Sequence, residues 1–235
     1  MVYAREVEDR ELTFGVSGKL IRNVLVMYDR QTESLWSQLL GESVAGDMQG
    51  TKLEFLPSWH TTWGQWKEMH PETLALRKGF RGGRDPYVGY YQSNSAGVIG
   101  ETFRDDRLAT KEFVIGVEID GTAIAYPFRV LSSEQMVNDT VAGQDILVVF
   151  YRQNGTGVVY DRRVGDETLS FEISSENPFT LRDLETGSTW NALTGQATSG
   201  KMAGSSLERI KSTIVFWFGW KDFHTDTLVY GLDIS

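Results

Sequence analysis

The chain has 235 residues, with 23 Lys and Arg against 32 Asp and Glu, a formal net charge of −9 and no Cys. This acidic balance argues against a general nucleic-acid binder, which needs a basic face to displace counterions from phosphates. The lack of Cys excludes disulfides, thiolate nucleophiles and Cys-ligated metal clusters. No apolar run approaches the roughly 20 residues of a membrane-spanning helix.

The first ten residues are charged and hold no apolar signal-peptide segment. We therefore expect either a cytoplasmic protein or a chain from which a leader has been removed.

An internal repeat is the strongest signal in the sequence. Residues 27–76 align without gaps on residues 181–230, and 18 of the 50 pairs are identical. Upstream, residues 2–14 align on residues 159–171. The identical pairs include three tryptophans and one histidine, namely Trp36/Trp190, Trp63/Trp217, Trp66/Trp220 and His70/His224. The alignment predicts a first repeat unit at 1–78, a connector at 79–111 and a second, complete unit at 112–235.

The second unit opens with residues 112–157, which have no equivalent in the first. We therefore expect the first unit to lack its opening strands. Three explanations stay open: a chain trimmed at its N-terminus, a gene with a misplaced start, or a half-unit completed by strands of a neighbouring chain.

The elements are expected to be mainly β. Residues 61–70 are expected to be helical, because Trp63, Trp66 and His70 recur at i, i+3 and i+7 on one helix face, and residues 213–224 repeat this spacing. Residues 113–119 and 123–130, joined by Asp120-Gly121, predict a hairpin. Residues 145–151 and 157–162 predict the next pair, and residues 168–173 another strand. The fold class is therefore two tandem related β units, barrel-like or sandwich-like, with short Trp-bearing helices.

Positions that agree between the units are expected to be scaffold, since a packing solution must be duplicated and a single site need not be. The paired tryptophans are thus core candidates. Asp29/Asp183, with the Thr and Ser that follow, fits a turn whose side-chain oxygens bond nearby backbone N–H groups.

Unmatched polar positions are the better functional candidates. Asp29, Arg30 and Glu33 form a charged cluster that could do acid–base work if a pocket raised one carboxyl pKa, or could be a solvated loop. His60 with His70 could shuttle a proton, but two His in this spacing are too few for a metal site. We expect no metal and no cofactor.

The connector combines Arg and Tyr side chains that could bind sugars, carboxylates or a partner surface, or could fix the connector to the two units. The candidates are Arg84, Asp85, Tyr87 and Tyr90. Asn138 and Asp139 are further binding candidates, although we expect them rather to cap a turn after residues 132–137.

Several of these segments resemble the domain-of-unknown-function 3179 family. The matching motifs are LTFGVSG at residues 12–18, VMYDRQTESLWSQ at 26–38, HTTW at 60–63, RDPY at 84–87, AYP at 125–127 and VNDT at 137–140. The resemblance implies a two-copy layout and a bacterial or archaeal protein often made with a secretion signal, hence an extracytoplasmic location. The family's first copy usually carries a Cys-Pro-Leu-Cys segment, so no role of those cysteines can operate in this Cys-free chain.

Three functions follow as hypotheses. The first is a non-catalytic module that binds a small molecule or a protein in a cleft between the units. The second is a hydrolase-like enzyme that pairs Glu33 with Asp29 or Asp85. The third is a structural subunit, possible in a homo-oligomer, whose first unit accepts strands from a neighbouring chain.

Overall fold

The computed structural model describes residues 1–77 and 87–234. It is mainly β, as predicted, with several small sheets, four short helices and no closed barrel among the described residues. None of the described helices has the length and apolar character needed to cross a membrane. We refer below to the N-terminal half, residues 1–77, and the C-terminal half, residues 112–234.

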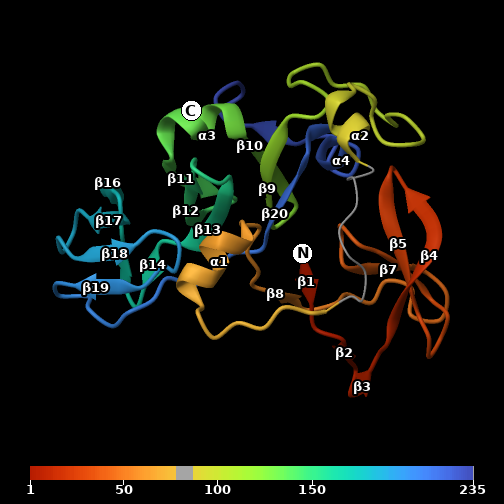
Figure 1. The fold of residues 1–235 in the computed structure, drawn as a ribbon, viewed down its shortest axis with the longest axis horizontal. Coiled ribbons are helices and arrows are strands. Elements are labelled where there is room, and N and C mark those ends of the chain that lie inside the picture. The colour runs from red at the N-terminus through yellow and green to blue at the C-terminus, as the bar shows by residue number, and fades with distance from the viewer. Residues whose placement is uncertain (78–86, 235) are drawn as a thin grey trace.

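Each half contains a four-stranded antiparallel sheet with the same strand order. In the N-terminal half its strands are β4 (Phe14–Ile21), β5 (Val24–Asp29), β6 (Leu35–Ser37) and β7 (Glu42–Ala45). In the C-terminal half they are β16 (Phe171–Glu176), β17 (Phe179–Asp183), β18 (Thr189–Asn191) and β19 (Ala197–Ser199). The two sheets lie at opposite ends of the molecule (Figure 1).

Both sheets are built around the same buried contact. The indole N–H of Trp36 donates to Asp29 Oδ2 at 2.9 Å, and that of Trp190 donates to Asp183 Oδ2 at 2.8 Å. The backbone N–H groups of Thr32 and Thr186 donate to the same two carboxylates, so the predicted turns are confirmed. Because they share these contacts, the two aligned segments pack in the same way.

Short two-residue strands accompany each sheet. They are β1 (Val2–Tyr3) paired with β8 (Phe55–Leu56), β2 (Glu6–Val7) with β3 (Arg10–Glu11), and β14 (Arg163–Val164) with β15 (Glu167–Thr168).

Two further sheets belong to the C-terminal half alone and lie in the middle of the molecule (Figure 1). One has the order β20 (Ser212–Phe216), β9 (Phe113–Ile119), β10 (Thr122–Pro127) and β21 (Leu228–Val229). The other is formed by β11 (Met136–Val141), β12 (Gln144–Tyr151) and β13 (Thr156–Asp161).

The predicted hairpins are present in these sheets. β9 and β10 are joined at Asp120 and Gly121, whose φ angles of 47° and 79° suit a turn that matches the strand twist.

Three sequence predictions about local structure are wrong. Residues 128–130, expected to continue the second strand of the first hairpin, are helical, because β10 ends at Pro127. Residues 213–216 belong to β20, because they pair with β9, and helix α4 (Trp217–Lys221) begins only after them. Asn138 and Asp139 lie within β11 rather than capping a turn, and helix α3 (Phe128–Glu134) ends before that strand.

The helix predicted at residues 61–70 is present as α1 (Trp63–Met69), and Thr62 caps its N-terminus. Although α1 follows the N-terminal sheet in the chain, it lies against the C-terminal half (Figure 1). Thr156 Oγ1 lies 2.8 Å from Thr61 Oγ1, and the Asn154 amide reaches Gln65 Oε1 at 3.5 Å. The chain therefore crosses between the halves just before α1.

Candidate functional site

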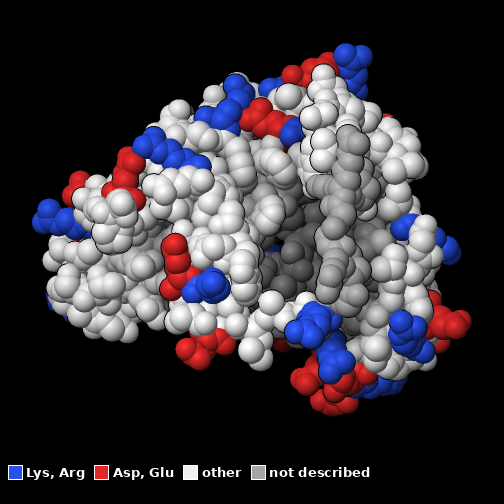
Figure 2. Space-filling view, viewed as in Figure 1, with Lys and Arg blue, Asp and Glu red and all other residues white. Residues whose placement is uncertain are grey.

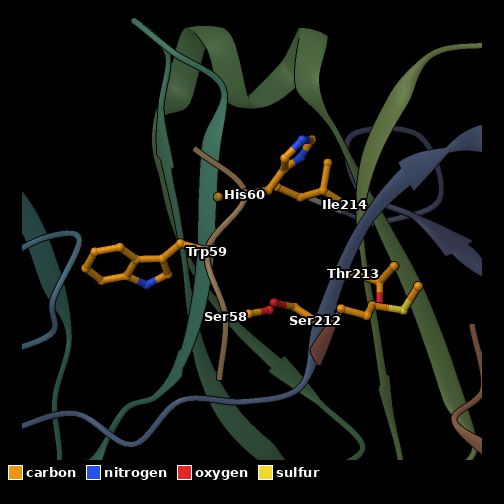
Figure 3. Close-up of a pocket in the computed structure, with 8 residues that line it drawn as sticks. Ser58, Trp59, His60, Ser212, Thr213 and Ile214 are labelled. Carbon is orange, nitrogen blue, oxygen red and sulfur yellow. The ribbon is translucent and has the colours of Figure 1, made fainter. Parts of the chain in front are cut away.

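The crossing segment, residues 57–62, separates two cavities between the halves. The smaller one is about 240 Å³ in volume and lies between this segment and β20. Figure 3 shows the Ser58 and Ser212 side chains pointing toward one another across it, while the Trp59 side chain points to the other side. Trp59 therefore takes part in the larger cavity.

The larger cavity is an open groove of about 640 Å³ with an aromatic wall. The rings of Trp59 and Trp66 meet edge-on with centroids 5.8 Å apart, and the His70 ring lies 4.2 Å from Trp66. Thr194, Gln196 and Arg209 of the C-terminal half line the opposite side. We call this cavity the tryptophan groove.

Arg209 supplies a positive charge to the tryptophan groove. Its guanidinium lies 5.4 Å above the centre of the Trp59 ring and donates to the Ser58 carbonyl at 2.9 Å. Burial lowers the pKa of Arg209 from its ordinary value. Within residues 1–77 and 87–234, no carboxylate oxygen lies within 4.0 Å of this guanidinium. The groove thus has room for an acidic group beside a desolvated cation.

Trp59 has an unused donor. Its indole N–H is buried and has no hydrogen-bond acceptor among the described residues. A buried donor without an acceptor costs about 1–3 kcal/mol.

The position in the C-terminal half that corresponds to the tryptophan groove is filled. There the cavity measures only about 50 Å³ and is lined by Trp220 and His224, by Gly116 and Glu118 of β9, and by Leu39 and Leu40. The Trp220 ring lies directly on Gly116, since a Cβ at that position would come within 2.3 Å of the ring. Strand β9 therefore occupies the space that is open in the tryptophan groove.

The tryptophans of α4 are buried, whereas the first tryptophan of α1 is exposed. Trp217 and Trp220 are 0% and 3% exposed, whereas Trp63, the counterpart of Trp217, is 53% exposed. The prediction that Trp63 belongs to the core is wrong for this reason: no strand of the described residues covers that face of α1. Even so, the Trp66 indole donates to Thr73 at 2.8 Å, as the Trp220 indole does to Thr227.

The charged cluster predicted in the N-terminal half lies away from both cavities. Asp29 is fully buried. Burial works against its ionisation, but the hydrogen bonds from Trp36 and Thr32 outweigh that effect and hold its pKa below the usual value. Arg30 is exposed and donates to the Tyr28 hydroxyl at 2.8 Å, and Glu33 is exposed at a φ of 58°.

The two described connector candidates, Tyr87 and Tyr90, do not line either cavity. Arg84 and Asp85 lie outside the described residues. Tyr87 precedes helix α2 (Val88–Gln92). The Tyr90 ring packs 6.4 Å from Phe216 and lies under the Lys111 ammonium.

Asn138 and Asp139 are engaged within the C-terminal half. The Asn138 amide bonds both the N–H and the carbonyl of Phe171, linking β11 to β16. The Asp139 carboxylate accepts from the Tyr126 hydroxyl at 2.7 Å.

The two histidines proposed as partners line different cavities. His60 lines the smaller cavity and His70 the tryptophan groove. No group of three or more His, Cys, Asp or Glu that could hold a metal ion occurs among the described residues.

Sequence reasoning did not select Trp59 and Arg209. The signal was available, because both are unmatched positions: the repeat alignment places Thr213 opposite Trp59 and Phe55 opposite Arg209. Their contact across 150 positions of the chain is a property of the fold and could not be read from either segment alone.

Comparison of the sequence with models of known protein families identifies the family to which the chain belongs. A family model described as "Protein of unknown function (DUF3179)" matches residues 1–227, so the chain belongs to this family. No curated protein and no solved structure matches the chain significantly.

Proposed function

We propose that this protein is a non-catalytic binding module whose partner occupies the tryptophan groove. The observation that carries the proposal is the Arg209 guanidinium, which lies over Trp59 at the groove without a described carboxylate nearby. Aromatic anchors and arginine are the side chains that contribute most to binding when water is excluded around them.

The chemistry of the groove selects for a partner with an acidic group next to an apolar surface. The carboxylate would pair with Arg209, and the apolar part would cover Trp59 and Trp66, which are only half-buried. On the face seen in Figure 2, most of the charged side chains that are coloured lie toward the rim.

The enzyme hypothesis has less support. It requires a carboxyl group with a raised pKa, yet hydrogen bonding holds the pKa of Asp29 low. Both Asp29 carboxylate oxygens already accept hydrogen bonds from Thr32, and one of them also from Trp36. We therefore keep binding as the proposed function.

An aromatic sulfonate dye, anilinonaphthalene sulfonate, tests the proposal because it carries an anion beside an apolar ring system. We expect it to bind with a fluorescence increase, and we expect Trp66→Ala and Arg209→Gln each to weaken binding at least tenfold. The matched control is Arg182→Gln, since Arg182 is an exposed strand residue facing Glu172 outside the groove.

Unchanged dye affinity in both groove variants, with binding still present, would contradict the proposal. If Arg30→Gln abolished binding instead, the site would be the charged loop beside Asp29.

A further inference from the structure

We infer that the cavity of about 50 Å³ beside α4 is a binding site for a small monovalent anion, such as chloride or formate, between Lys211 and His224. Strand β9 and the start of β20 form its walls, and Leu39 and Leu40 of the N-terminal half border it. Among the described residues, none that lines this cavity also lines the tryptophan groove. The site is therefore separate from the one proposed above and adds a second ligand.

Lys211 brings a positive charge to the cavity. Its ammonium group donates to the Leu40 carbonyl at 3.3 Å, and within residues 1–77 and 87–234 no carboxylate oxygen lies within 4.0 Å of it. An ammonium group has three N–H donors, so further donors remain for a ligand. No direct ion pair with a described residue neutralises this charge.

His224 is the second donor, and its ring is held by stacking. The ring centroids of His224 and Trp220 are 4.0 Å apart, and Nδ1 lies 4.0 Å from Glu118 Oε2, which is too far for a hydrogen bond. Neither ring nitrogen has a hydrogen-bond partner in the part of the chain that the structure describes. Both nitrogens of a protonated imidazole are donors, so Nε2 can donate to an anion while Nδ1 faces Glu118.

The surroundings of these two groups lack negative charge. Burial lowers the pKa of His224, and nearby Lys211 adds to this effect, although Glu118 opposes it. Burial also lowers the pKa of Lys211, to which Lys52 contributes and which Glu118 again opposes. Glu118 alone thus does not compensate for the two cations. An anion in the cavity would favour the protonated form of both groups.

Size and charge define the class of anion. A cavity of about 50 Å³ holds about one or two water-sized groups, because a water molecule takes about 30 Å³ in the liquid. When His224 is protonated, it and Lys211 outnumber the single carboxylate of Glu118, so one negative charge completes neutrality. The Glu118 side chain is 48% exposed, and water therefore screens its repulsion of the anion. Thr213, which is 5% exposed, adds a hydroxyl group to the wall.

The test follows the three histidines of the intact protein by NMR during pH titration, with His224 assigned through His224→Gln. Sodium chloride and sodium formate are each compared with sodium gluconate, whose anion is too large for the cavity, at equal ionic strength. We expect chloride and formate to raise the pKa of His224 by about one pH unit, which corresponds to about tenfold tighter binding to the protonated form. His60 is exposed and serves as the reference, which should titrate alike in the three salts.

One lysine variant and a matched control locate the anion. Lys211→Gln should abolish the difference between chloride and gluconate at His224. Lys201→Gln should retain it, because Lys201 is an exposed lysine that pairs with Glu167 at 3.3 Å outside the cavity.

Three results would overturn the inference. If His224 of the wild-type protein titrates identically in the three salts, the cavity holds water only, and this result needs no variant. If His60 shifts as much as His224, the effect is one of salt in general. If the chloride effect persists in Lys211→Gln, the anion does not lie between Lys211 and His224.

Discussion

Helices α1 and α4 have related sequences, but α4 is covered by a strand and α1 borders an open groove. In the C-terminal half, the indole of Trp220 lies on Gly116 and leaves a cavity of about 50 Å³. In the N-terminal half, the indole of Trp66 lines a groove of about 640 Å³, and Trp63 is exposed. The same local sequence therefore gives a closed core where β9 is present and an open groove where no described strand covers it. Burial of these indoles depends on the neighbouring strand rather than on their own spacing.

The largest expected effect concerns the helix tryptophans themselves. Trp217→Ala should destabilise the protein by about 3–5 kcal/mol, because it empties a filled core. Trp63→Ala should cost only about 1 kcal/mol, because about half of the side chain is in water. Urea unfolding of both variants measures the difference, and equal losses would contradict the contrast between the halves.

The two sheets that are built around Asp29 and Asp183, by contrast, should lose similar stability when these residues are substituted. Asp29→Ala and Asp183→Ala each leave a buried indole N–H without its acceptor, which costs about 1–3 kcal/mol. Urea unfolding should give similar losses for the two variants. A large effect in only one half would show that the two sheets are less equivalent than their hydrogen bonds indicate.

The same two carboxylates predict an acid dependence. Hydrogen bonds hold the pKa of Asp183 below its usual value despite burial, as they do for Asp29. A carboxyl group with a lowered folded-state pKa stabilises the fold above its unfolded pKa of about 3.9, and this contribution is lost as pH falls through the folded-state value. The stability difference between wild type and the double variant Asp29→Ala/Asp183→Ala should therefore narrow below about pH 4. A difference that stays constant down to pH 2 would show that ionisation of these groups does not matter.

The smallest effect is expected at Glu33. Glu33→Gln should change the free energy of unfolding by about 0.5 kcal/mol or less, since the side chain is exposed. It should also leave dye binding in the tryptophan groove unaltered. Weakened dye binding in this variant would move the site to the charged loop and favour the paired-carboxylate hypothesis.

The sequence predicts features that depend on residues a few positions apart better than features that depend on contacts between distant parts of the chain. The Asp120-Gly121 hairpin and the Asp29 turn were predictable, because each is decided by residues a few positions apart. Strand β20 is not revealed by the tryptophan spacing, which continues into a helix only after residue 216; residues 213–216 are Thr, Ile, Val and Phe, which favour a strand.

The site was harder to predict than the fold. Trp59 and Arg209 meet only because the chain crosses from one half to the other after β8. The repeat alignment showed both as unmatched positions, but no local pattern placed them together. Exposure of Trp63 likewise depends on what packs against α1, where none of the strands that the structure describes lies over this side chain, and the sequence of the helix does not reveal this.

Amide hydrogen exchange compares the two halves most directly. We predict fast exchange for Trp59 and His60, whose N–H groups have no described backbone partner, and slow exchange in Thr213–Val215, which pairs with β9. Equally strong protection of both segments in the free protein would contradict the central claim that the N-terminal half presents an open edge.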